Sequence, residues 1–149
     1  MWCFMFSFAE EKRGWNRKRS DENSRTVRAL NVTRGTVVGE QICVADGLLS
    51  RMIGLLGKSS LAPGAGLLIR PSQGVHTIGM MFTIDLLFLD RNFRVTELRQ
   101  SLRPFRMTGL NWRAQSVLEL PVNSIELSRT AIGDQLVIEP AVFLPGNAA

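Results

Sequence analysis

The feature of this sequence that most constrains the fold is a short apolar run, Ile84 to Leu89, which contains one carboxylate, Asp85. The run is too short for a helix with its caps, and it lies between Gly79 and the turn-forming residues Asp90-Arg91-Asn92. These bounds indicate a mostly buried β-strand. A buried carboxylate loses its hydration, at a large cost in free energy, unless polar groups replace the water. We therefore expect the partners of Asp85 to mark the centre of the fold.

The nearest candidate partners of Asp85 are the backbone N–H groups of the preceding turn, together with Thr83 and His76. Arg51 is a further candidate that could reach the carboxylate from elsewhere in the fold. Buried polar groups usually belong to structural hydrogen-bond networks. The simplest interpretation is that Asp85 ties the loop from His76 to Thr83 to the strand.

Short strand-like segments separated by turns continue along the chain, with a helix expected from Asp46 to Gly57 and a helical turn from Asn123 to Arg129. No βαβ repetition is visible, so the pattern favours a mainly β (α+β) domain. We predict a compact antiparallel β-sandwich or barrel with one or two short helices. The expected strands are residues 36–44, 67–69, 84–89, 94–102, 116–120 and 135–139, and 84–89 forms a hairpin with 94–102.

The chain has 149 residues, which suits one domain with its own core. Residues 1–30 carry seven Lys or Arg and four acidic residues in an aperiodic sequence, and we expect a flexible basic tail there. Residues 36–139 are the predicted globular domain, and 140–149 a C-terminal tail. The apolar residues 1–9 are far fewer than the roughly 20 of a membrane span. They also lack a preceding basic segment, so we expect no transmembrane segment or secretory signal, and a cytoplasmic location.

Arginines dominate the charge of residues 91–113, where Glu97 is the only acid. Such a stripe could attract an anionic ligand or a protein partner. Nucleic-acid binding is the weaker expectation, because few aromatic residues interleave with the arginines. The arginines are Arg91, Arg94, Arg99, Arg103, Arg106 and Arg113.

The two cysteines, Cys3 and Cys43, have no metal-binding spacing, and we expect neither a structural disulfide nor a thiolate metal site. A Cu(I) site built from His76, Cys43 and the methionines at 80 and 81 is a remote alternative, because methionines beside a strand usually fill the core. No metal and no cofactor is therefore expected.

The candidate site consists of polar residues that could converge in a mainly apolar pocket, which is the usual composition of a small-ligand site. They are Arg51, His76, Thr77, Asp85 and Glu119. The favoured function is binding of a small anionic or polar ligand.

Two other classes of function stay open. The first is a structural or protein-interaction domain that uses the arginine-rich face. The second is a hydrolase-type enzyme in which Asp85 orients His76 as general base and Thr77 or Ser72 is the nucleophile. No nucleophile elbow, phosphate-binding loop or HExxH motif supports catalysis.

Several motifs in one order resemble the domain of unknown function 192 family over about residues 36–139. The resemblance implies a small, mainly β single domain and no established activity. In many members the loop before the Ile-Asp strand reads Phe-Trp-Met-Lys-Asn-Thr, whereas residues 76–80 here read His-Thr-Ile-Gly-Met, so roles of that loop are not carried over. The motifs are Arg51 with Gly54-Leu55-Leu56, Gly66 to Ile69, His76 to Met80, Ile84 to Asp90, Val117 to Pro121, and Gly133-Asp134.

Overall fold

A computed structural model describes residues 25–46, 55 and 59–141 of the chain. Most of the expected helix from Asp46 to Gly57, including Arg51, lies outside the described residues. So do residues 1–24 and 142–149 of the two expected tails.

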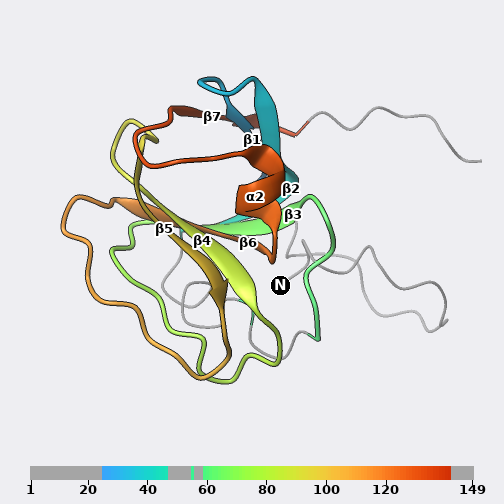
Figure 1. The fold of residues 1–149 in the computed structure, drawn as a ribbon, viewed down its shortest axis with the longest axis vertical. Helices are drawn as coiled ribbons and strands as arrows, with labels where there is room; N and C mark the ends of the chain where they lie inside the picture. Colours follow the sequence, from blue (N-terminus) through green and yellow to red (C-terminus); the bar gives the residue numbers. More distant parts are fainter. Residues whose placement is uncertain (1–24, 47–54, 56–58, 142–149) are drawn as a thin grey trace, which may run out of the picture.

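Seven strands form one sheet in the order β5-β4-β6-β3-β2-β1-β7 (Figure 1). All neighbours pair antiparallel except β2 and β3, which are parallel. The prediction of a mainly β fold is therefore confirmed. The strands are β1 (Thr26–Asn31), β2 (Thr36–Ala45), β3 (Ala65–Ile69), β4 (Ile84–Leu89), β5 (Val95–Leu102), β6 (Ser116–Pro121) and β7 (Leu136–Pro140), and one short helix, α2 (Ser124–Ser128), precedes β7.

The sheet curls into a half-barrel, so that its two edge strands approach each other at one end (Figure 1). An isolated antiparallel bridge joins Arg94, just before β5, to Gln135, just before β7. The N–H of Val95 also donates to the carbonyl of Asp134 at 2.9 Å. Backbone pairing of the two edges partly closes the barrel and satisfies groups that an open edge would leave exposed.

Each face of the sheet carries its own core. The barrel cluster fills the inside of the curl and receives Ala29 of β1, Val95 of β5 and Leu136 of β7, with Ile125 of α2 packed among them. The loop cluster lies on the other face, where residues such as Met80 and Ala114 from the long connections cover Leu86 and Val117. Residues of one strand alternate between the two cores, as the pleat requires.

The first strand corrects the expected boundary of the N-terminal tail. Residues 26–30, predicted as the end of that tail, belong to β1, which pairs with both β2 and β7. Arg28 gives the segment a tail-like polarity, but it forms an ion pair with Glu139 on β7. This segment is a strand because it pairs with β2 and β7, and its own sequence has no clear strand pattern.

Candidate functional site

Asp85 is buried, as its place in the apolar run predicts, with 1% of its surface exposed. Its Oδ1 accepts a hydrogen bond from the N–H of Ser101 at 2.9 Å, and its Oδ2 accepts one from the N–H of Ile125 at 3.1 Å. Both partners are backbone groups far along the chain. The specific partners expected from sequence, Thr83, His76 and the preceding turn, are therefore wrong, although the requirement for complementary polar groups is met.

These two hydrogen bonds have a clear structural origin. A register shift between Ile84 and Leu86 makes a bulge in β5, where Ser101 has a left-handed φ of 54°. A bulge frees an N–H from the strand ladder, and Asp85 accepts it. The second bond goes to the first turn of α2, whose N-cap residue, Asn123, makes no side-chain capping bond. Asp85, on β4, therefore caps the N-terminus of α2.

Thr77 and His76 lie on the loop before β4, with opposite surroundings. Thr77 is fully buried, and its hydroxyl donates to the carbonyl of Arg103 at 2.8 Å and accepts from the N–H of Arg106 at 2.9 Å. His76 is exposed and forms a backbone bridge with Met107. Thr77, not Asp85, therefore ties this loop to the fold.

Glu119 is the one buried carboxyl among the described residues that has an oxygen without a hydrogen-bond partner. It lies on β6, paired with Leu67 on one side and Leu86 on the other, and only 3% of its surface is exposed. Its Oε2 is buried and has no hydrogen-bond partner. Burial raises the pKa of Glu119 to about 8, because the charged form loses its hydration. The carboxyl is therefore mostly protonated at pH 7.

Asp85 and Glu119 face opposite sides of the sheet. Asp85 shares its side with Leu87 of the barrel cluster, whereas Glu119 shares its side with Val117 of the loop cluster. Leu86 pairs with Glu119 and Leu120 pairs with Asp85, so the two carboxyls alternate across adjacent strands. The structure does not bring them into one site.

No group of three or more His, Cys, Asp or Glu side chains suited to a metal occurs in the part of the chain that the structure describes. Cys43 is disulfide-bonded, so the expectation that the chain forms no disulfide is wrong. A disulfide sulfur is not a thiolate, and Cys43 therefore does not complete the Cu(I) set considered from the sequence.

A comparison of the chain with known proteins identifies its family. Residues 28–138 match the DUF192 family, which is described as an uncharacterised ACR. The chain belongs to the DUF192 family. A UPF0127 protein of Thermococcus sibiricus is 30% identical over 115 residues, which are 72% of this chain and 71% of that protein. A UPF0127 protein of Pyrococcus furiosus is 31% identical over 110 residues, 72% of this chain and 94% of the relative.

The DUF192 fold also occurs in two crystal structures of low sequence identity. A protein from Sinorhizobium meliloti, described as a candidate transcription regulator, superposes with a TM-score of 0.67 and 18% identity, covering 81% of this chain and 98% of its own. A protein of unknown function from Novosphingobium aromaticivorans gives a TM-score of 0.65 and 15% identity, covering 76% and 84%. At these identities the likeness establishes the fold alone.

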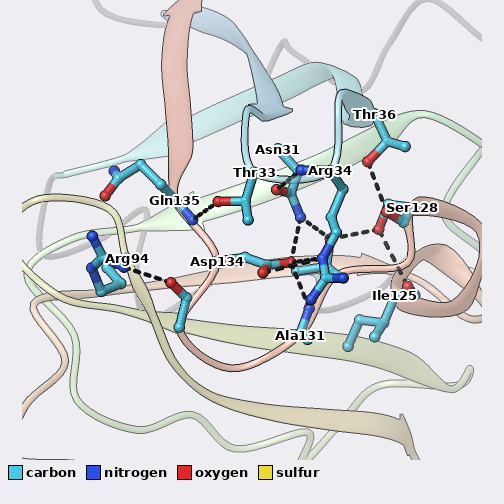
Figure 2. A network of polar contacts seen from close by, with 12 residues as sticks. Asn31, Thr33, Arg34, Thr36, Arg94, Ile125, Ser128, Ala131, Asp134 and Gln135 are labelled. Carbon is cyan, nitrogen blue, oxygen red and sulfur yellow. Dashed lines mark hydrogen bonds and ion pairs between the residues drawn. The ribbon is translucent and has the colours of Figure 1, made fainter.

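This DUF192 domain also contains a buried polar network that the sequence did not reveal (Figure 2). Asp134 accepts hydrogen bonds at 2.9 Å from the side chains of Asn31 and Arg34 and from the N–H of Ala131. Asn31 donates a further bond to Thr130. The network joins the β1–β2 turn to the connection after α2. Asn31 and Asp134 are 103 positions apart in the sequence, and only the Gly133-Asp134 turn gave a local signal.

Proposed function

We propose that this DUF192 domain is a non-catalytic binding module that holds a small polar ligand against the carboxyl of Glu119. The observation that supports the proposal is the buried, unpartnered Oε2 in an otherwise apolar core. An unsatisfied polar group in such a place costs about 1–3 kcal/mol of stability. A leucine of similar volume would avoid this cost. We therefore attribute the presence of a carboxyl at this position to ligand binding.

The chemistry of Glu119 narrows the class of ligand. With a pKa of about 8, its carboxyl at pH 7 offers both an O–H donor and a carbonyl acceptor. Its neighbours Leu67 and Leu86 are fully apolar. A complementary molecule has a mostly apolar body and one polar group, either a carbonyl acceptor or an amine.

The other candidate residues contribute differently to this proposal. Asp85 and Thr77 are engaged in hydrogen bonds within the protein, so their part is to stabilise the fold. Support for a His76–Asp85 catalytic pair is weak, because His76 is exposed while both oxygens of Asp85 accept backbone N–H groups. Arg51 lies outside the described residues, so its part in the site stays a prediction from the sequence.

Thermal-shift screening at pH 7 tests the ligand proposal. The probes are small amines, amides and ketones with apolar bodies, measured on the wild-type chain, Glu119→Leu and Ser116→Ala. Ser116 is the matched control, because it lies on the same strand and its hydroxyl is likewise buried without a partner. We expect ligands that raise the Tm of wild type and Ser116→Ala and have no effect on Glu119→Leu.

Two results would contradict the ligand proposal. One is a set of ligands whose Tm shifts persist in Glu119→Leu. The other is a panel without any hit combined with a Glu119→Leu protein that is less stable than wild type, because the carboxyl would then be a structural group.

A second candidate function, interaction with a protein, rests on the arginine-rich face. Arg103, Arg106 and Arg113 are exposed, and no acidic residue occurs from residue 98 to residue 118. Charge of one sign attracts partners of the opposite sign and speeds their association.

A further inference from the structure

Two loops expose an unusual number of large apolar side chains. We call residues 73–82 and 103–113 the paired loops, and they run side by side in light green and orange in Figure 1. Six of their apolar side chains are between 51 and 74% exposed. Large exposed apolar groups gathered in one region mark an interaction site. The six are Ile78, Met81, Phe105, Met107, Leu110 and Trp112.

Hydrogen bonds hold the paired loops together, so their exposed side chains have a fixed base. The N–H of Thr77 donates to the carbonyl of Arg106 at 2.8 Å, and the N–H of Thr108 donates to the carbonyl of Val75 at 3.0 Å. Thr77 is buried and Val75 packs against the loop cluster. With these side chains turned inward, the intervening His76 is exposed.

The charged residues within the paired loops have one sign. Arg103, Arg106 and Arg113 are exposed on the second loop. No Asp or Glu occurs in residues 71–84 or 98–118. Glu97 of β5 accepts a hydrogen bond from the side chain of Asn111, but it also forms an ion pair with Arg99. The surface therefore combines apolar side chains with a net positive charge.

We propose that the paired loops dock on the surface of a bilayer that contains anionic phospholipids. The arginines would contact the phosphodiester head groups, while the apolar side chains enter the boundary between head groups and acyl chains. Trp112 suits this depth, because its ring is apolar and its N–H can still donate to a polar group. The inference is independent of the ligand site at Glu119, and it gives the arginine-rich face a partner other than a protein.

The composition of the surface favours lipid over nucleic acid or an acidic protein. Ile78, Met81, Met107 and Leu110 are aliphatic or thioether side chains that cannot stack on bases, whereas base stacking carries most single-strand recognition. An acidic protein would neutralise the arginines but would need a shaped apolar surface for these side chains as well. A fluid bilayer accepts them without shape matching. On the expected cytoplasmic location, the facing leaflet is the anionic one.

Vesicle flotation of the full chain tests the docking proposal. The vesicles are pure phosphatidylcholine or phosphatidylcholine with roughly 30% phosphatidylserine, which reproduces the anionic character of a cytoplasmic leaflet. The charge variant is Arg103→Gln with Arg106→Gln, and its control is Arg91→Gln with Arg129→Gln, at exposed positions outside the loops. The apolar variant is Met107→Ser with Trp112→Ser, and its control is Leu127→Ser with Ile132→Ser, on α2 and the turn after it.

We expect binding to the anionic vesicles that weakens with salt, and little binding to phosphatidylcholine alone. Each arginine removed from the loops lowers the partition coefficient about fivefold, so the double variant loses about 25-fold. The apolar variant also loses binding, and both control variants keep it.

Three results would overturn the docking proposal. The first is the absence of flotation with anionic vesicles at low salt. The second is equal binding by the loop variants and their controls, which would assign any binding to another part of the chain. The third is retention of a fluorescent oligonucleotide or polyglutamate by the paired loops without any vesicle binding.

Discussion

Asp85 and Glu119 are carboxyls on adjacent strands of the same sheet, yet their surroundings differ. Asp85 accepts two backbone N–H groups, and these bonds stabilise the fold. Glu119 has an oxygen without any donor, and its pKa rises to about 8. The first residue therefore acts as a structural anchor, whereas the second reduces stability in the absence of a partner.

Replacing Glu119 by leucine should make the protein more stable at pH 7. The change removes an unsatisfied buried carboxyl and keeps a similar volume within the loop cluster, so the free energy of unfolding should rise by about 1–3 kcal/mol. Urea denaturation measures the difference. Glu119→Gln is the control, because its amide stays polar and buried and should bring no such gain. An unchanged or lower stability of Glu119→Leu would mean that the carboxyl has a stabilising partner.

The raised pKa of Glu119 also predicts how stability depends on pH. Between its ordinary value of 4.5 and about 8, the folded chain keeps the proton while the unfolded chain releases it. Folding therefore binds a proton in this window, and the free energy of unfolding falls as the pH rises, by at most about 1.4 kcal/mol per pH unit. Denaturation curves at pH 5, 6, 7 and 8 measure the slope. Glu119→Gln should flatten it, and an equal slope in both proteins would assign the effect to another group.

At the scale of elements, α2 begins where the local sequence predicts a helical turn, but a residue distant in sequence caps it. The helix has five residues, and its N-cap residue Asn123 makes no side-chain bond. Its N-terminus is satisfied by Asp85, 40 residues earlier in the chain. A helix this short depends on tertiary contacts, here the packing of Ile125 in the barrel cluster.

The elements predicted from sequence are those that local patterns define. The β4–β5 hairpin, the β6 strand and the helical turn after Asn123 are confirmed, because turn residues and apolar runs bound them. The strand β1 was missed, because Arg28 looks in the sequence like a residue of the charged tail. Its ion pair with Glu139 of β7 is visible only in the structure. The parallel pairing of β2 with β3 also has no local signature.

The candidate site was predictable only in part, for a similar reason. A carboxylate inside an apolar strand predicts its own burial, and this prediction is correct for Asp85. The identity of its partners depends on which segment folds over it. The bulge at Ser101, which frees an N–H for Asp85, has no signature in the sequence of β5.

Replacing Asp85 by asparagine should destabilise α2 and the β5 bulge together. An amide has a single acceptor oxygen, so one of the two backbone N–H groups loses its partner and faces an NH₂ group instead. We expect the free energy of unfolding to fall by about 2–4 kcal/mol, measured by urea denaturation. Asp90→Asn is the control, because the N–H groups of Asn92 and Arg94 both donate to Oδ1 of Asp90, so an asparagine there keeps both bonds and should change stability little. Equal losses in the two variants would mean that the missing second acceptor oxygen is not the cause at Asp85.

At the scale of the whole molecule, the half-barrel is held closed at the end where β5 and β7 meet. The bridge between Arg94 and Gln135 joins the two edges, and the side chain of Arg94 donates to the carbonyl of Gly133 at 2.7 Å (Figure 2). Directly beside this bridge, the side chain of Asp134 accepts hydrogen bonds from Asn31, at the end of β1, and from Arg34, in the β1–β2 turn. Residues 133–135 therefore take part both in the contact that closes the barrel and in the hydrogen-bond network of Asp134.

Replacing Arg34 by glutamine should weaken this closure in acid. The hydrogen bond from Arg34 is the main cause that lowers the pKa of Asp134 from 3.8 to about 2, with smaller effects of Asn31 and the N–H of Ala131. A lowered folded-state pKa gives stability that is present above about pH 4 and is lost as the pH falls towards 2. Without the guanidinium, the pKa of Asp134 should rise, so this stability is lost at a higher pH.

Two measurements check the effect of Arg34. NMR titration of the Asp134 carboxyl should show a higher pKa in Arg34→Gln, and acid unfolding followed by circular dichroism should begin at a higher pH. Arg99→Gln is the control, because its ion pair with Glu97 is exposed and surface pairs contribute little. The carboxylate of Asp134 holds the turn whose backbone carbonyl accepts the N–H of Val95, so loss of its charge should open the barrel at the β5–β7 contact first. Equal protection factors for Val95 and Leu136 in Arg34→Gln and wild type at pH 3 would contradict that order of events.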